Sequence, residues 1–165
     1  GEGESVLASV RAEIKQVTDE IVEIFGSGQG SVKATPPGLD LMEEISERYG
    51  VPVEEYSARM SKLLSSFRLS KASLDRLRSL ILRRCDLSLT VAELKMADNP
   101  NLPNTRIGLI WSLTVPEVEA GLVREAILKS GVSSSKEKSR VTDLLQLLFD
   151  LSKEVQASHI LRKRK

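Results

Sequence analysis

The sequence predicts an all-α protein, in which a coiled-coil-like N-terminal helix precedes a compact domain of about seven helices. Apolar residues recur at helical spacing through most of the chain. Glycine and proline fall between these periodic stretches, where helices end, and no stretch alternates apolar and polar residues as a half-buried strand does. With 165 residues, 41% of them hydrophobic, the chain can bury one core of ordinary size.

Residues 4–25 carry the most regular pattern and are predicted to form the first helix. Six apolar residues lie alternately three and four positions apart, as in the seam of a coiled coil: Leu7, Val10, Ile14, Val17, Ile21 and Ile24. A seam this short is compatible with two partners. The helix either pairs with a second copy, which would make the protein a homo-oligomer, or packs against the globular body of its own chain.

Residues 26–38 predict a linker, because they contain Gly-Ser-Gly-Gln-Gly-Ser followed by Thr-Pro-Pro-Gly. Glycine raises the entropic cost of order, and Pro-Pro stiffens the chain. The helical domain is therefore expected to span residues 39–157, and residues 158–165 are expected to form a basic tail.

The first helices of this domain have recognisable end signals. Gly50 is placed to end one helix, Pro52 to begin the next, and Ser70 or Ser73 to cap the third. The segment Thr90–Glu93 matches a capping box, in which a threonine and a glutamate satisfy each other's backbone amides. It predicts a separate short helix there.

Residues 107–115 are almost wholly apolar and include the single tryptophan, Trp111. We interpret them as the central buried helix, with a buried strand as the alternative, because short apolar runs fit both. A further helix is predicted from Pro116 to Gly131, and the last helix from about Glu137 to Gln156.

Charge is divided along the chain, although the net charge is only +1. Residues 1–56 hold twelve acidic and four basic side chains, whereas residues 57–84 hold eight basic side chains and only Asp75 as an acid. Such a basic segment predicts binding to an acidic protein, to a nucleoprotein or to RNA through its phosphates, with ordinary solvated helix faces as the alternative. The eight residues are Arg59, Lys62, Arg68, Lys71, Arg76, Arg78, Arg83 and Arg84.

The chain ends in a second basic cluster, made of Arg162, Lys163, Arg164 and Lys165. Three interpretations are open for it: a nuclear import signal, a contact with nucleic acid or with an anionic membrane surface, or a solubilising tail.

The residues needed for catalysis or for metal binding are scarce. His159 and Cys85 are the only histidine and the only cysteine, and no serine-hydrolase, phosphate-loop or zinc-protease motif occurs. We therefore predict a protein that is not an enzyme, without catalytic residues, cofactor, metal or small-molecule substrate. The absence of an internal disulfide, of a signal segment and of a long apolar run predicts an intracellular protein, cytoplasmic or nuclear.

Two family resemblances extend this interpretation. Ile45-Ser46-Glu47-Arg48-Tyr49 followed by Pro52, and Leu102-Pro103 followed by Arg106 and Trp111, resemble the C-terminal domain of rhabdovirus phosphoproteins. The order of parts, a coiled-coil-like helix before a linker and a helical domain, is also similar to that family. This resemblance implies an oligomerisation helix and a domain that binds a nucleocapsid.

A second resemblance is to the N-terminal domain of orthomyxovirus matrix proteins. It is carried by Leu113-Thr114-Val115-Pro116, by Gly121-Leu122 and by a late helix that leads to a basic cluster. This resemblance implies a helical protein that forms a layer and contacts RNA and membrane.

The leading hypothesis from sequence is a non-enzymatic helical adaptor that self-associates and binds a nucleoprotein or another acidic partner. The alternative is a matrix-like protein that assembles into a layer and binds RNA or an anionic membrane through its basic helices.

Overall fold

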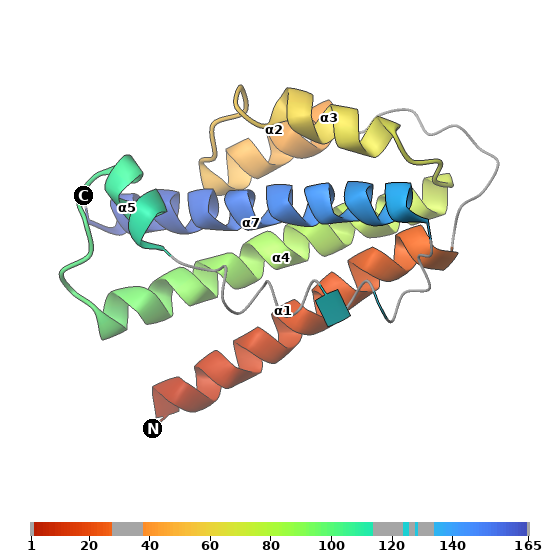
Figure 1. The fold of residues 1–165 in the computed structure, drawn as a ribbon. Coiled ribbons are helices and arrows are strands. Elements are labelled where there is room, and N and C mark those ends of the chain that lie inside the picture. Colours follow the sequence, from red (N-terminus) through yellow and green to blue (C-terminus); the bar gives the residue numbers. More distant parts are fainter. Residues whose placement is uncertain (1, 28–37, 114–123, 126–127, 129–133, 165) are drawn as a thin grey trace.

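The computed structural model describes residues 2–27, 38–113, 124–125, 128 and 134–164, and it confirms the all-α class. Within this part of the chain there are six helices and no strand (Figure 1). They are α1 (Glu2–Ser27), α2 (Gly38–Tyr49), α3 (Ser57–Ser65), α4 (Lys71–Asp98), α5 (Arg106–Ser112) and α7 (Ser135–Lys163). Most of the predicted linker and of the helix predicted from Pro116 lies outside the described residues.

The two longest helices, α4 and α7, form the middle of the molecule and run side by side in the same direction (Figure 1). Ser88 of α4 lies opposite Ser152 of α7, with their hydroxyl oxygens 2.7 Å apart, and farther along Lys95 donates to Gln156. On one side of this pair lie α2 and α3, and on the other side α1 runs antiparallel to α4 (Figure 1). The arrangement has three layers.

The central helix of the core is α7. Glu154, Val155, Gln156 and Ala157 are all buried, and four successive residues, each turned by about 100° from the last, reach every side of a helix. A helix buried on nearly all sides needs neighbours on all sides, and α7 contacts α2, α3, α4 and α5.

The N-terminal helix α1 packs along α4 and is part of the main core. Val10, Val17, Ile21 and Ile24 of the predicted seam are buried, and Leu7 and Ile14 are half-buried. Most of the seam is therefore used within the chain, which is the second of the two pairings expected from the sequence.

Several predicted helix ends agree with the structure. Gly50 follows α2 with a positive φ of 73°, and its N–H donates to the carbonyl of Ser46 at 2.8 Å, as in a glycine C-cap. A Cβ at this position would lie 2.5 Å from Oγ of Ser158 in α7, so this hydroxyl, which donates to the carbonyl of Gly50, would have to move. Ser70 caps α4 by accepting from the N–H of Ser73 at 3.1 Å. The helix expected to begin at Pro52, however, is α3, which begins at Ser57.

Two predicted boundaries are wrong. The capping box at Thr90–Glu93 does not begin a helix, because α4 continues through it and the amides are already bonded within the helix. Leu87, Ser88 and Ala92 stay buried against their neighbours, which keeps this part of α4 in the core. In the same way α7 continues to Lys163, so most of the predicted basic tail, 158–165, is helical, and Ile160 within it is fully buried.

The described part of the apolar run, residues 107–113, does not form the central helix, nor a strand, and residues 114–115 lie outside the described residues. Residues 107–112 belong to the seven-residue α5, which lies at one end of the molecule beside the C-terminal part of α7 (Figure 1). So short a helix can bury only one side. Leu109 and Leu113 are on the buried side, whereas Ile107 and Trp111 are 68% and 83% exposed.

No helix in the described ranges is both long enough and apolar enough to cross a membrane.

Candidate functional site

Four of the eight residues of the predicted basic surface are paired with acidic residues of the same chain. On the α1 side, Arg76 of α4 lies 3.3 Å from Glu20, and Arg83 of α4 forms an ion pair with Glu13. The acidic N-terminal segment and the basic segment that follows it are thus complementary faces of one fold. The charge division in the sequence is largely explained by this packing.

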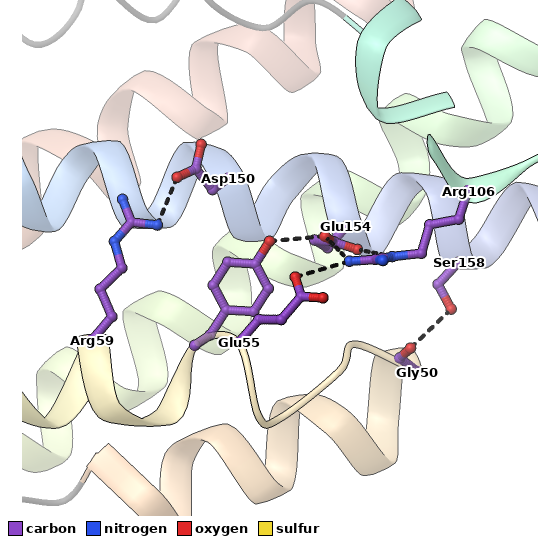
Figure 2. A network of polar contacts seen from close by, with 8 residues as sticks. Gly50, Glu55, Arg59, Arg106, Asp150, Glu154 and Ser158 are labelled. Atoms are coloured by element: carbon purple, nitrogen blue, oxygen red, sulfur yellow. Dashed lines mark hydrogen bonds and ion pairs between the residues drawn. The ribbon is translucent and has the colours of Figure 1, made fainter. Parts of the chain in front are cut away.

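The α2 side of α4 and the α3 side of α7 repeat this arrangement. Arg78 of α4 pairs with Glu44 of α2, and Arg59 of α3 lies 2.8 Å from Asp150 of α7 (Figure 2). These four arginines therefore do not form the single free face that the sequence predicted. They lie on different sides of the bundle, and each has a carboxylate partner within the chain.

Arg84 is a clearer correction, since it is 3% exposed. Its guanidinium donates to the hydroxyl of Thr18 in α1 at 2.8 Å and lies 5.2 Å from the ring centroid of Phe149 in α7. It joins three helices from inside the core and is not accessible to a partner.

Three of the eight predicted residues remain on the surface without an ion pair to any described carboxylate: Lys62, Arg68 and Lys71. They lie at the end of α3, in the turn to α4 and at the start of α4. The N-terminal part of α7 lies beside this turn, because Arg140 donates to the carbonyl of Ser66 at 3.1 Å.

We call Lys62, Arg68, Lys71, Lys136 and Arg140 the basic end. Lys136 is one helical turn before Arg140 and therefore shares its face of α7. Sequence reasoning missed these two residues because they lie far along the chain from the predicted basic segment, and only the parallel course of α4 and α7 brings their N-termini together. The acidic residues within one helical turn of these cations in the sequence are Asp75, Glu137 and Asp143.

Helix dipoles add little net potential here. The N-termini of α4 and α7 lie at this end, but so do the C-termini of α1 and α3 (Figure 1). Because their partial charges are opposite, the side-chain cations dominate the local field.

The most buried charged network lies elsewhere, around Glu154 of α7, which is 4% exposed (Figure 2). Its carboxylate accepts from Nε of Arg106 at 2.9 Å, from the second nitrogen of the same guanidinium, and from the hydroxyl of Tyr56 at 2.8 Å. Arg106 also contacts Glu55 at 3.1 Å. The network fastens α5 and the start of α3 to α7.

This network has the features of a structural contact. Its hydrogen bond to Glu154 raises the pKa of Arg106, and burial followed by the Glu154 hydrogen bond raises the pKa of Tyr56. Both groups therefore keep their protons firmly, and the carboxylate is saturated with donors. No sequence signal joins these residues, because they come from three distant segments.

The groups considered for chemistry are also occupied. Burial raises the pKa of the Cys85 thiol to about 12, so it stays protonated at neutral pH. Nε2 of His159 lies 2.6 Å from Glu93, whose pKa is lowered chiefly by that hydrogen bond. Among the described residues, no three histidine, cysteine or acidic side chains are grouped as a metal site.

The predicted basic tail is partly engaged as well. The guanidinium of Arg164 donates to the carbonyl of Leu102 at 2.9 Å and to the side chain of Asn104 at 3.0 Å, just before α5. Lys163 lies 3.6 Å from Glu93, and Arg162 is exposed. Lys165 lies outside the described residues.

An open groove of about 700 Å³ lies between the N-terminal half of α1 and α4. Its apolar lining comes from Val6, Val10 and Leu87, and Val6 is 42% exposed.

The chain matches no protein-family model, and no curated protein or solved structure is significantly similar to it.

Proposed function

We propose that the protein is a non-enzymatic helical adaptor that binds an acidic partner, a nucleoprotein or an acidic protein, through its basic end. The observation that carries this proposal is the contrast between two sets of cations. Arg59, Arg76, Arg78 and Arg83 each face a carboxylate of the chain, whereas the five residues of the basic end have no such partner among the described residues.

The geometry favours contact with charge and not recognition of bases. The lysine and arginine residues of the basic end come from α3, the following turn, α4 and α7, and none of them is an aromatic residue on which a base could stack. A polyanion bound there would release counterions, so its affinity would fall steeply with salt.

Self-association is the second part of the proposal, and the N-terminal half of α1 supports it. Val17, Ile21 and Ile24 are consumed by packing on α4, but Val6 is exposed and Leu7 is half-buried beside the open groove. The surface available for a second copy is therefore this half of α1 and the groove, not the whole predicted seam.

The basic end is tested with the variant Arg68→Glu/Lys71→Glu and the matched control Arg11→Glu/Arg124→Glu. All four residues are exposed, and both variants change the net charge equally. With fluorescent oligouridylate and poly-glutamate as probes at low salt, the first variant should lose at least about tenfold in affinity and the control at most about twofold. Equal losses in both variants would show that only net charge matters, and absence of binding by the unmodified chain to both probes would remove the proposal.

A further inference from the structure

The exposed side of α5 is unusual for this molecule. Among the described residues, only four large hydrophobic side chains are exposed: Val6, Ile107, Trp111 and Leu128. Ile107 and Trp111 are four residues apart in one helix and therefore project to the same side. Two of the three most exposed large apolar side chains of the described residues thus form one protrusion, which we call the α5 knob.

The knob is held rigidly. Leu109 and Leu113 anchor the opposite side of α5 in a small core with Ala157 and Ile160 of α7. Thr105 caps the helix by accepting from the N–H of Gly108 at 3.0 Å. Further fixation comes from the Arg106–Glu154 contact (Figure 2) and from Arg164, which holds residues 102–104. A preorganised knob loses little conformational entropy when it binds.

The same molecule carries a groove of suitable size, between α1 and α4. The groove is open to solvent, and its volume of about 700 Å³ is within the range of ligand sites, about 300–1,000 Å³, so its volume does not exclude an indole ring. The groove exists because the residues at its rim are small. Ser5 and Ser9 of α1 and Thr90 of α4 leave unfilled the space that larger residues fill farther along the two helices.

The charges around the two sites are opposite in sign. Asp86 lines the groove, where Glu13 and Arg83 offset each other. Arg164 lies just before α5, where it donates to the carbonyls of Leu102 and Pro103, and it forms no ion pair with a described carboxylate. Asp86 at the groove accepts a hydrogen bond from Tyr49 and keeps its negative charge. One anionic side chain at the groove and one cationic side chain beside the knob favour each other across an interface.

We propose that the α5 knob of one molecule inserts into the α1–α4 groove of a second molecule. This inference rests on the self-association part of the proposed function and names its two surfaces. The proposed contact is heterologous, with one knob in one groove and no reciprocal contact between the same two molecules. Each pair then keeps one free knob and one free groove, so assembly continues into a chain or a ring, whereas two reciprocal knob–groove contacts would stop at a symmetric dimer.

The knob is tested with Trp111→Ser and the groove with Ser9→Arg, which places a large cation in the groove. Their matched controls are Leu128→Ser, at another exposed hydrophobic residue, and Ala12→Arg, at another exposed position of α1. In light scattering at rising concentration, the unmodified chain and both controls should grow beyond a dimer. Each test variant alone should stay a monomer, and their equimolar mixture should form dimers only, from one intact knob and one intact groove.

The single tryptophan gives a second readout, because its emission should shift to the blue as the concentration of the unmodified chain rises. Growth of Trp111→Ser equal to that of the unmodified chain, as in symmetric pairing of two α1 helices, would overturn the inference while leaving self-association intact. A blue shift only with vesicles containing phosphatidylserine would overturn it in favour of a membrane contact. A monomer at all concentrations would remove self-association and this inference together, while binding of the basic end to oligouridylate remains a separate measurement.

Discussion

Two neighbouring arginines show how much one helical position decides. Arg83 is exposed and forms a surface ion pair, whereas Arg84 is buried between α1, α4 and α7. A run of basic letters in a sequence does not distinguish them, but helical periodicity does. Arg84 continues the inward stripe of Leu77 and Ile81, which Ser88 then extends. The burial of Arg84 was thus accessible from the sequence, although its partners Thr18 and Phe149 were not.

This difference predicts unequal losses of stability. Arg84→Ala removes a buried hydrogen bond and a ring contact and leaves a cavity, so it should lower the free energy of unfolding by about 2–4 kcal/mol. Arg83→Ala removes a solvent-exposed pair and should cost at most about 1 kcal/mol. Urea denaturation followed by circular dichroism measures both. Equal losses would contradict the buried position of Arg84.

A second prediction at this scale concerns alkaline pH. The pKa of Cys85 is about 12 in the folded protein and about 8.5 in an unfolded chain. Below about pH 8.5 the thiol therefore keeps its proton in both states. At higher pH the unfolded state releases the proton and the folded state does not. The free energy of unfolding therefore falls as pH rises, by up to about 1.4 kcal/mol per pH unit. Burial raises the pKa of Tyr49 and Tyr56 too, which adds to the loss at the upper end.

Urea denaturation between about pH 7 and 10.5 tests this dependence, with Cys85→Ala as the comparison. The variant should be less stable at neutral pH, because it leaves a small cavity, but its stability should decline less steeply above about pH 9. In a parallel measurement, a thiol reagent should modify Cys85 only in urea, since this is the single cysteine. Rapid modification of the folded protein at pH 8 would be inconsistent with the burial described.

At the scale of elements, α5 shows where sequence reasoning failed. The run 107–115 is the most apolar in the chain, and apolarity alone predicted the central helix. Helix length was the missing consideration, because Pro103 lies just before the cap at Thr105 and α5 ends at Ser112. The existence and the start of the last helix, in contrast, were predicted well, since a long stripe of leucines is specific for a buried helix, although α7 continues seven residues past the expected end at Gln156.

The attachment of α5 gives a prediction of its own. Glu154→Ala leaves the buried Tyr56 hydroxyl and the half-exposed Arg106 without their shared acceptor, so stability should fall by about 2–3 kcal/mol. Amide hydrogen exchange should become faster across Arg106–Ser112 than across α1. As a control, Arg59→Ala removes the more exposed pair with Asp150 and should leave exchange in α5 unchanged. Unchanged exchange in α5 of Glu154→Ala would mean that its apolar contacts suffice.

For the whole molecule, the sequence predicted the all-α class but not the relation between its charged segments. Acidic and basic stretches that looked like a binding signal are mainly the two sides of internal interfaces, with Glu20 and Glu44 facing arginines on opposite sides of α4. Composition by segment cannot separate internal from external complementarity, because that depends on which helices pack together. The parallel course of α4 and α7 brings the remaining cations together at one end.

The salt dependence of oligouridylate binding tests most directly whether the cations of the basic end, and not the arginines paired within the fold, bind the partner. For single strands, the slope of log affinity against log salt changes by about 0.7 for each cation that contacts a phosphate. Arg68→Ala/Lys71→Ala should therefore flatten the slope by about 1.4. Arg76→Ala/Arg83→Ala removes two cations that already face Glu20 and Glu13, and it should leave the slope unchanged. A slope that changes with the second pair and not with the first would contradict the assignment of the basic end.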